Sequence, residues 1–425
     1  MLKIDKKYIE TDFNIKEYES SLINIKNKII NKDGLGNEFL GWYDLAKNGL
    51  DKSELEKIKH IKKEWITLKI EVVIFIGIGG SFIGTKAGIE MIQSYYDSNI
   101  EIIYLTDFSN NKLNNLKNKL KNKNWALTVV SKSGTTLETS INFRILREEL
   151  FNKYQDQINK RIVFITDEKS GILRKIADNK KYMTLKIPSN IGGRFSALTS
   201  VGIFALELKN VNINQIFSGS KLVIDEFENE GVLHNKNFYY VSLRDFLINK
   251  KNKFIEVFAN FDENLDYISE HYKQIFAESE GKKENIVFPT ISHYPNDLHS
   301  IGQYYQEGSK NFFETILYAE KYKDNNLIKK SLFDNDDELD YLENYEFNKI
   351  NEIIATSLSQ AHFNDAKINV LILKLEDLSE KSFGYIYTWL CLSASISAYL
   401  NDVNPFNQPG VENYKKYIKK NTKNY

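Results

Sequence analysis

The sequence predicts an α/β protein of two doubly wound domains, each a three-layer arrangement of a parallel sheet flanked by helices, with helical extensions at both ends. Two observations carry this prediction. Short β-branched runs alternate with helix-length segments, which is the βαβ rhythm of a parallel sheet covered by helices. The alternation occurs twice along a chain of 425 residues, a length that suits two domains.

The strand-like runs are rich in valine, isoleucine and aromatic residues. In the first half of the chain they lie at 71–77, 101–105, 126–130, 161–166 and 181–187. In the second half they lie at 253–259, 284–290, 312–318 and 369–375. Helical periodicity predicts a helix over 240–250, before the second set, and helices over 349–367 and 383–400, around its last strand.

These elements predict four segments. Residues 1–55 show helical periodicity without a strand pattern and are expected to form a helical N-terminal segment, followed by the two domains at 56–210 and 230–376. The polar region near 209–235 separates the domains, and residues 377–425 form a C-terminal helical segment whose basic end is expected to fray. The apolar stretch Phe383–Leu400 contains one threonine and three serines, so we expect a buried helix and not a membrane span.

Composition restricts the class of function. Lys+Arg and Asp+Glu are both 57, so nothing in the whole-chain charge favours nucleic acid or an anionic membrane as a partner. One cysteine, Cys391, excludes an internal disulfide framework and a multi-cysteine metal site, which fits a reducing compartment. The first residues contain no apolar run like a signal peptide, so we expect a cytoplasmic protein.

A glycine-rich turn directly follows the first strong strand: Gly77-Ile-Gly-Gly-Ser-Phe-Ile-Gly84. Glycines there let backbone N–H groups approach an anion at the start of a helix. A dinucleotide fingerprint is the competing interpretation, with Asp107 placed to hold a ribose. The spacing opposes it, because the third glycine of that fingerprint would fall at Phe82. Taken alone, such a turn can also be purely structural.

A hydroxyl-rich turn, Ser131-Lys-Ser-Gly-Thr-Thr136, follows the third strand of the first domain. Hydroxyls and N–H groups at the carboxyl end of a strand, without a Walker lysine, suit a phosphate monoester better than a polyphosphate. Alone this segment could simply cap a helix. Together with the glycine-rich turn, it predicts a compact phosphate site at the carboxyl edge of one sheet.

With these two motifs the chain resembles the sugar isomerase domain family and, within it, the short bacterial type of phosphoglucose isomerase. Four further segments carry the resemblance, which spans about residues 40 to 420: GGRFS at 192–196, QIFAESEG at 274–281, DLHSIGQ at 297–303 and FNQPGVENYK at 406–415. It implies two sugar-isomerase-type domains. The implied activity is the cofactor-free and metal-free conversion of glucose 6-phosphate to fructose 6-phosphate and back, in glycolysis and gluconeogenesis.

Such a reaction requires a base that reaches both carbon 1 and carbon 2, a cation for the enediolate, an acid/base pair for ring opening and a phosphate anchor. Glu278 is the candidate base. It lies four residues after Gln274, so a helix would place both side chains on one face. The resemblance implies that Glu278 moves the proton through a cis-enediol; without the motif it would be an ordinary solvated carboxylate.

The resemblance assigns the other catalytic roles to Arg194, His299 and Lys415. Arg194 follows two glycines and carries a fixed charge that suits an enediolate, although an arginine is as often a surface ion-pair partner. A histidine side chain exchanges protons near neutral pH, although a lone histidine is more often structural. Lys415 lies in a lysine-rich tail, where a solvated charge is the usual interpretation.

In the family, the residue matching His299 reaches the active site from the partner subunit and works with the lysine that matches Lys415. This implies a homodimer with shared active sites and a small phosphosugar as substrate. The substrate-binding residues implied by the resemblance are Gly80, Ser81, Ser131, Lys132, Ser133, Thr136, Gly193, Gln274 and Gln408. Lys132 is expected to contribute its backbone N–H and not its side chain.

Three rival functions remain open from the sequence. The first is another isomerase of the same domain family, acting on an aminosugar phosphate or also accepting mannose 6-phosphate. The second is a phosphosugar-binding regulator without catalysis, which the joint presence of Glu278, Arg194, His299 and Lys415 opposes. The third is a dinucleotide-dependent oxidoreductase, which Phe82 opposes.

Overall fold

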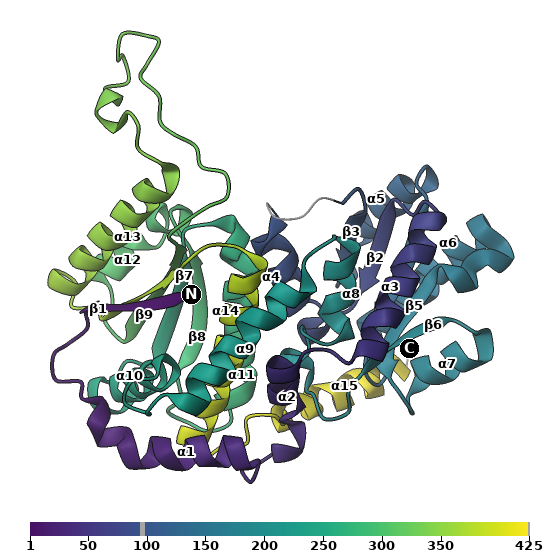
Figure 1. Ribbon diagram of the computed structural model, residues 1–425, viewed down its shortest axis with the longest axis horizontal. Coiled ribbons are helices and arrows are strands. Elements are labelled where there is room, and N and C mark those ends of the chain that lie inside the picture. The colour runs from purple at the N-terminus through teal and green to yellow at the C-terminus, as the bar shows by residue number, and fades with distance from the viewer. Residues whose placement is uncertain (94–97, 424–425) are drawn as a thin grey trace. The chain divides into compact units, whose positions relative to one another are not determined.

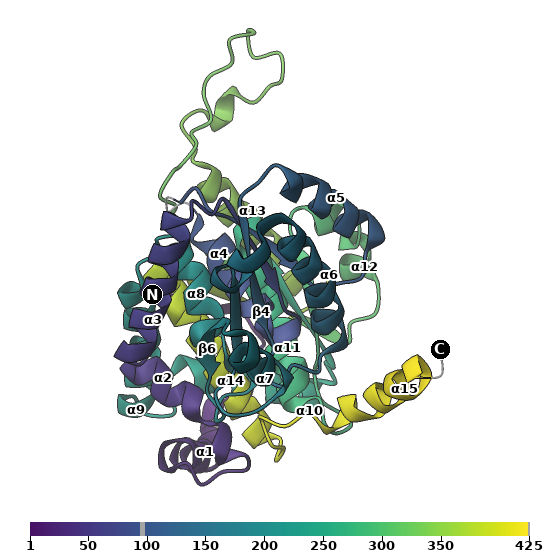
Figure 2. The same ribbon diagram turned by 90° about the vertical axis from the view of Figure 1, so that its right-hand side faces the viewer.

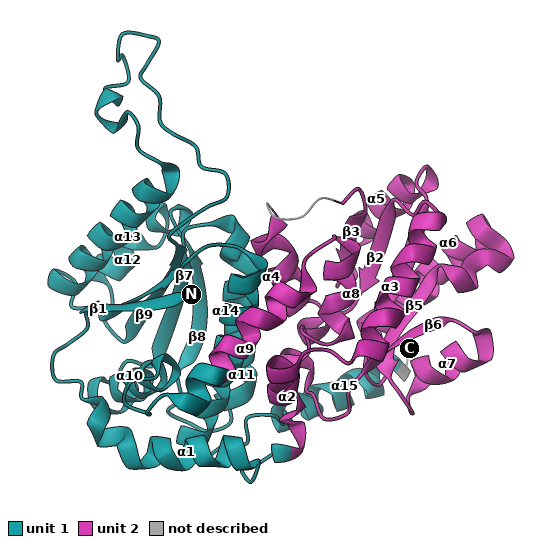
Figure 3. Cartoon of the chain, viewed as in Figure 1, with its two compact units in different colours: residues 1–37, 225–425 teal, residues 38–224 magenta. Residues whose placement is uncertain are grey.

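The computed structural model describes residues 1–93 and 98–423 (Figure 1). The chain forms two compact units, coloured separately in Figure 3. Unit 1 comprises residues 1–37 and 225–425, and unit 2 comprises residues 38–224. The boundary falls inside the long helix α9 (Ile213–Asn229), within the polar region that we expected to separate two domains.

Unit 2 contains a parallel five-stranded sheet of order β3-β2-β4-β5-β6. Its strands are β2 (Val72–Ile76), β3 (Glu101–Leu105), β4 (Trp125–Val130), β5 (Ile162–Asp167) and β6 (Met183–Ile187). Every residue of β2 and β4 is buried, as expected for apolar strands in the middle of a sheet covered on both faces. All five predicted strands of the first half are therefore confirmed.

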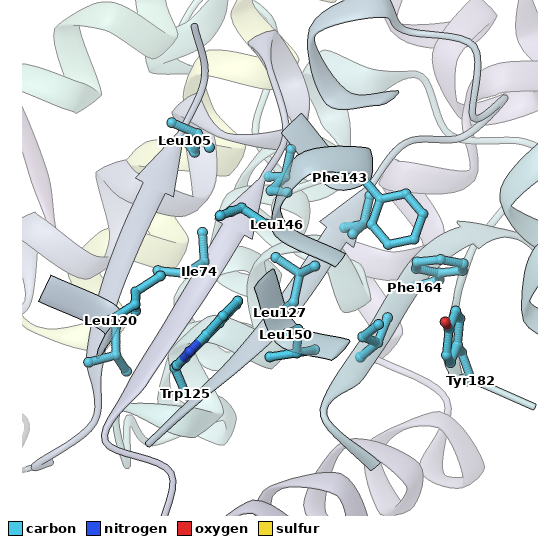
Figure 4. Packing of buried hydrophobic residues seen from close by; sticks show 14 of the residues in the cluster. Ile74, Leu105, Leu120, Trp125, Leu127, Phe143, Leu146, Leu150, Phe164 and Tyr182 are labelled. Carbon is cyan, nitrogen blue, oxygen red and sulfur yellow. The ribbon is translucent and has the colours of Figure 1, made fainter. Parts of the chain in front are cut away.

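Helices cover both faces of this sheet. Those of unit 2 are α2 (Gly41–Asn48), α3 (Lys52–Thr67), α4 (Ile83–Met91), α5 (Asn110–Lys121), α6 (Leu137–Tyr154), α7 (Ile172–Lys180) and α8 (Ser200–Leu208). On one face, Leu120 of α5 and Leu146 of α6 pack with the strand residues Leu127 and Phe164 in one buried cluster (Figure 4). Leu173 of α7 belongs to the same cluster. Helices α3 and α4 both pack against α8, and none of these three helices contributes a residue to this cluster.

Unit 1 contains a second five-stranded sheet, of order β1-β10-β9-β7-β8. Its strands are β1 (Leu2–Tyr8), β7 (Ile255–Asn260), β8 (Phe288–His293), β9 (Phe312–Ala319) and β10 (Val370–Leu375). The last four are parallel, and β1 pairs antiparallel with β10. The predicted fold class is confirmed, since both units are sheets of parallel strands flanked by helices, with one antiparallel edge strand added.

The helices of unit 1 also lie on both faces of their sheet. They are α1 (Glu19–Asn31), α10 (Lys236–Lys251), α11 (Asp266–Glu280), α12 (Gly302–Glu307), α13 (Phe347–Asn364), α14 (Glu380–Leu400) and α15 (Glu412–Lys423). Tyr305 of α12 and Ala355 of α13 belong to a core cluster with the strands. Helices α1, α10 and α11 all pack on α14. Nearly every residue of α14 is buried, which confirms the predicted buried helix.

The expectation of a purely helical segment over residues 1–55 is wrong at its start, because Leu2–Tyr8 forms strand β1. Leu2 lies opposite Leu375 of β10, and only Leu2 and Tyr8 of this strand are buried. A strand with three lysines has no clear apolar alternation, but charged residues are what an exposed sheet edge favours. The pairing with β10, far away in the sequence, produces this strand.

One predicted strand of the second half starts later than expected. The strand predicted at 284–290 begins later, at Phe288, because Asn285 has a left-handed backbone conformation with φ 56° that interrupts an extended chain. The basic C-terminal segment forms helix α15 as far as Lys423, and the fraying of its end stays a prediction.

Both sheets have the same strand order when the parallel strands are counted within each unit: second, first, third, fourth. In this arrangement the connections leave the first and third strands in opposite directions, so their carboxyl ends open a crevice where α/β proteins bind ligands. In unit 2 this crevice lies between β2 and β4, and in unit 1 between β7 and β9.

Residues 320–346 of unit 1, between β9 and α13, project away from its sheet in both views (Figures 1 and 2).

Candidate active site

The glycine-rich turn follows β2 and leads into α4. Gly79 has φ +58°, a conformation that glycine adopts at little cost. Gly80 lies so close to the segment 192–196 that a Cβ on it would be 2.2 Å from the carbonyl oxygen of Gly193. The Ser196 hydroxyl donates to the Gly193 carbonyl at 2.7 Å and to the Gly80 carbonyl at 3.4 Å. The turns containing Ser81 and Arg194 are therefore packed backbone to backbone.

The hydroxyl-rich turn follows β4 and leads into α6. Ser131 is buried, and its hydroxyl oxygen accepts a hydrogen bond from the Gly134 N–H at 3.0 Å and lies 3.5 Å from the Thr136 hydroxyl. The Ser133 hydroxyl lies 2.7 Å from the Thr135 hydroxyl and accepts from its N–H at 3.2 Å. Gly134 has φ +73°, which lets the turn close over Ser131.

The Lys132 side chain has backbone partners in the segment before Gly193. Its ammonium group donates to the carbonyl oxygens of Ser189 at 2.8 Å and Ile191 at 3.3 Å. Burial lowers the pKa of Lys132, an effect that the nearby carboxylate of Asp167 opposes. The lysine thus joins the hydroxyl-rich turn to the segment that precedes Gly193, and three turns of unit 2 form one connected group.

This group is suited to bind an anion. β2 and β4 are neighbours at the switch point of the sheet, and each ends in a turn that opens a helix, α4 and α6. Helix N-termini present unpaired N–H groups and partial positive charge, and serine and threonine hydroxyls add donors. A phosphoryl group is the ligand that this combination favours.

Arg194 belongs to the same unit and is 2% exposed, so it is not the surface arginine that was the alternative interpretation. It lies in a short 3-10 helix, Gly193–Phe195, and its guanidinium group is 5.4 Å from the Phe195 ring centre. Because an arginine side chain keeps its charge at any physiological pH, a buried one supplies a fixed positive charge beside the anion group.

The candidate base lies in unit 1, near the end of α11. The Gln274 amide N–H donates to one carboxylate oxygen of Glu278, Oε1, at 2.9 Å, so the two side chains do share one helix face. The Gln408 amide N–H donates to the other, Oε2. This contact, which the sequence did not predict, fixes the orientation of the half-buried Glu278 carboxylate; the expected contact of Gln408 with substrate stays a prediction.

His299 and Lys415 are both exposed. His299 ends the short 3-10 helix Asn296–His299, which is fixed by Asp297, whose carboxylate accepts from the Ser292 hydroxyl and the His293 N–H, both at 2.8 Å. Lys415 lies in the first turn of α15, with its ammonium 3.0 Å from the Glu412 carboxylate. Both side chains therefore remain accessible to a ligand or to another protein chain.

The candidate residues thus form two local groups. Unit 2 carries the anion group: Gly80, Ser81, Ser131, Lys132, Ser133, Thr136, Gly193 and Arg194. Unit 1 carries the acid/base group: Gln274, Glu278, His299, Gln408 and Lys415. Sequence reasoning missed Ser196, which joins two turns of the anion group, and Glu280, which is buried two residues after the base in the same helix. Both residues lie inside motifs already noted in the sequence, and those motifs are the signal by which they could have been found.

Comparison with known proteins identifies the family. Residues 52–328 match the family model described as phosphoglucose isomerase. A glucose-6-phosphate isomerase of Mycoplasmoides gallisepticum is 40% identical over 405 residues, 94% of each chain. One from Mycoplasma genitalium is 36% identical over 421 residues, 98% of this chain and 97% of the relative.

Solved structures show the same fold. A hypothetical protein from Thermus thermophilus has a TM-score of 0.89 with 23% identity, covering 99% of this chain and all of the other. A glucose-6-phosphate isomerase from Chlamydia trachomatis has a TM-score of 0.80 with 18% identity, covering 99% of this chain and 88% of the other. With motifs, fold and nearly full-length relatives in agreement, this chain belongs to the phosphoglucose isomerase family.

Proposed function

We propose that this chain catalyses the reversible conversion of D-glucose 6-phosphate to D-fructose 6-phosphate. The observation that carries the proposal is the Glu278 carboxylate, held by an amide donor on each oxygen at the end of a buried helix. A carboxylate in a fixed orientation is what a base needs to serve two adjacent carbons. The anion group of unit 2 supplies the phosphate anchor.

In the proposed mechanism, His299 and Lys415 first open the sugar ring. One group gives a proton to the ring oxygen while the other takes the proton of the hydroxyl on carbon 1, which leaves the open-chain aldehyde. Glu278 then removes the proton from carbon 2, and the electron pair moves to form a cis-enediolate. The proton of the hydroxyl on carbon 2 passes to the oxygen of carbon 1, and the carboxyl group of Glu278 returns its proton to carbon 1, which gives the ketose.

Arg194 stabilises the enediolate in this scheme. The negative charge develops on the oxygens of carbons 1 and 2, and a guanidinium cannot protonate the intermediate but can attract it. The substrate phosphate binds to the backbone N–H groups and hydroxyls of Ser81, Ser131, Ser133 and Thr136. The reaction needs no electron acceptor, because one carbon is oxidised while its neighbour is reduced.

We also propose that the working form is a homodimer with shared sites, in which His299 acts on the substrate of the partner subunit. Two features support self-association. His299 is exposed on a firmly held turn. The projecting segment 320–346 exposes Leu332 by 93% and Phe333 by 74%, and these two residues lie in the stretch 331–348, which contains no lysine or arginine. Exposed apolar side chains bordered by charge are typical of protein interfaces.

The cytoplasm is the proposed location, where the substrate and a reduced Cys391 would both be found. No helix among residues 1–93 and 98–423 combines the length and the apolar character needed to cross a membrane. Glycolysis and gluconeogenesis are the proposed pathways.

A steady-state assay tests the function. Purified protein should convert fructose 6-phosphate to glucose 6-phosphate in buffer with added chelator, detected by a coupled dehydrogenase. Glu278→Gln should lower kcat by roughly 100- to 10,000-fold or more, because the amide cannot accept the proton, with a small change in KM. Wild-type-like turnover in this variant would remove Glu278 from the mechanism.

The same assay separates the rival functions. Glucosamine 6-phosphate and mannose 6-phosphate, offered under identical conditions, should be turned over much more slowly. Preference for either would make the chain a different phosphosugar isomerase. Binding of fructose 6-phosphate without turnover would indicate a regulator, and tight binding of NADH would indicate an oxidoreductase.

A further inference from the structure

A buried ionic cluster includes the last residue of the helix that carries the candidate base. Arg244 of α10, Glu256 of β7 and Glu280 of α11 are each at most 1% exposed. The Arg244 guanidinium donates to the Glu256 carboxylate at 2.6 Å through Nε, and to both oxygens of Glu280 at 2.6 and 3.1 Å. It also donates to the Ser397 hydroxyl oxygen at 2.8 Å. Four of its five N–H groups are thus used.

The cluster is costly to rearrange. One guanidinium faces two carboxylates, and the hydroxyls of Tyr240 and Thr315 each donate to Glu256 at 2.7 Å, while the Ser397 hydroxyl donates to Glu280. Burial opposes the charge on Arg244, but Glu280 and Glu256 hold its pKa well above the ordinary value. Charges removed from water are tolerated only while their partners stay in place, so these side chains have one favourable arrangement.

Glu280 connects this cluster to the base. It is the last residue of α11, two positions after Glu278. Two residues correspond to about 200° around a helix, so the two carboxylates point in nearly opposite directions, Glu280 into the core and Glu278 outward. The last turn of a helix lacks part of its hydrogen bonding and tends to fray. The bidentate contact with Arg244 fixes this turn from below.

The cluster also fixes the segment that brings in Gln408. Ser397 lies in the last turn of α14, and the chain continues from there to Gln408, whose amide donates to Glu278. The ammonium of Lys282 bridges the same two segments, since it donates to the carbonyl oxygens of Ser279, at 2.8 Å, and Asn404. The base and its amide partner are therefore held by segments that meet at Glu280 and Ser397.

We propose that the Arg244–Glu280–Ser397 contacts are a positioning element that sets the Glu278 carboxylate over two adjacent carbons. This inference rests on the proposed isomerisation and deepens it. The two carbons are about 1.5 Å apart, so a base that serves both has little tolerance for displacement. A shift of about 1 Å costs a catalyst on the order of 100-fold in rate.

Glu280→Gln tests the proposal, and Glu256→Gln is the matched control. Each replaces one buried carboxylate on the same guanidinium by an isosteric amide, so each changes the cluster by the same charge. Only Glu280 belongs to α11; Glu256 lies on β7 and also accepts from Tyr240 and Thr315. Glu280→Gln should lower kcat by about 10- to 100-fold with KM within about threefold. Glu256→Gln should retain kcat within about threefold.

Proton transfer provides a readout that a purely structural role would not change. With substrate deuterated at carbon 2, wild type should pass part of the label to carbon 1 and lose the rest to water. A displaced carboxylate exchanges its proton more often before returning it, so Glu280→Gln should lower the transferred fraction at least twofold, and Glu256→Gln should leave it unchanged. Equal changes in both variants, or none in Glu280→Gln, would overturn the proposal.

A crystal structure of Glu280→Gln separates this inference from the proposed function. The proposal predicts that the contact between Glu278 and the Gln408 amide is lost or displaced in that variant and intact in Glu256→Gln, whatever the enzyme's substrate. An unchanged contact refutes the positioning role even if wild type isomerises the sugar. If Glu280→Gln does not fold, Ser397→Ala removes one hydroxyl from the same junction and should shift the transferred fraction in the same direction; no shift counts against the proposal.

Discussion

At position 80, the backbone of another segment leaves room only for a glycine. Its α-carbon faces the Gly193 carbonyl group and the Arg194 N–H so closely that no side chain fits, with distances of 2.2 and 2.6 Å to an added Cβ. The obstacle is backbone and not a flexible side chain, so it cannot rotate away. This contact holds the glycine-rich turn against the turn that carries Arg194.

Gly80→Ala should therefore destabilise the protein by about 1–3 kcal/mol, because the methyl group forces the two turns apart. It should also weaken phosphate binding, seen as a higher KM for fructose 6-phosphate. Thermal or urea unfolding together with steady-state kinetics would measure both effects.

Gly193→Ala, on the other side of the same contact, is the control for the stability measurement. A Cβ on Gly193 meets nothing within 4 Å, and this glycine has no positive φ. Gly193→Ala should leave unfolding within about 0.5 kcal/mol of wild type. If the two variants were equally destabilised, close packing would not explain why residue 80 has to be a glycine.

At the scale of elements, α11 and α14 enclose a buried histidine. His271 of α11 is stacked on Tyr387 of α14 with 4.7 Å between ring centres, and its Nε2 lies 4.0 Å from the Cys391 sulfur. Burial lowers the pKa of His271 to about 3. In the unfolded chain the pKa is the ordinary value of about 6.5.

The sign of the pH effect follows from this difference. The folded pKa is lower, so between pH 6.5 and 3 the unfolded chain binds the proton and the folded chain does not. The stability from this group is complete above pH 6.5 and is lost as the pH falls. Urea unfolding from pH 7 to pH 4.5 should show a decrease of up to about 1.4 kcal/mol per pH unit from His271.

A variant isolates that contribution. His271→Leu removes the titrating group and keeps an apolar side chain between the two helices, so its stability should fall less steeply over the same pH range. A curve parallel to wild type would mean that His271 does not couple protonation to folding. The variant also loses the ring stacking on Tyr387, which lowers stability at every pH, so the slope with pH and not the absolute stability is the quantity to compare.

The edge strand β1 shows the limit of local patterns for an element. Lys3 lies opposite Lys374 and Ile4 opposite Leu373 in the pairing with β10. Nothing within LKIDKKY predicts this partner, which is more than 360 residues away in the chain. Strand formation here depends on hydrogen bonds to β10, so a window of neighbouring residues carries little information about it.

At the scale of the whole molecule, the proposed sharing of sites between subunits makes a prediction. Glu278→Gln and His299→Ala proteins should each be nearly inactive, because each lacks one group from every site. Refolded or subunit-exchanged mixtures should recover up to about a quarter of wild-type activity, since a mixed dimer contains one site with both groups intact. Turnover of fructose 6-phosphate in the mixture is the measurement.

The absence of any recovery, in a mixture shown by mass to contain mixed dimers, would assign His299 to its own subunit's site. A protein that stays monomeric by light scattering at assay concentration would remove the sharing altogether. Mixing Glu278→Gln with itself, treated identically, controls for residual activity.

Much of the fold could be predicted from the sequence because the strands are apolar on both faces. Runs such as VVIFI in β2 and VLILKL in β10 are strong local signals, and parallel order follows from the helices between them. The candidate residues could be predicted because phosphate binding and proton transfer need particular residue types in motifs. The pairing of Gln274 with Glu278 followed from helical spacing alone.

The sequence by itself determined the α/β class, the two sets of parallel strands and the residue types suited to a phosphosugar isomerase, because these depend on local periodicity and motif spacing. Only the tertiary structure decided that Gln408 contacts the Glu278 carboxylate, and that Arg244, Glu256, Glu280 and Ser397 form one buried cluster. These side chains come from separate helices and a strand. Their contacts arise from packing between segments that are far apart in the chain, so no regular spacing in the sequence predicts them.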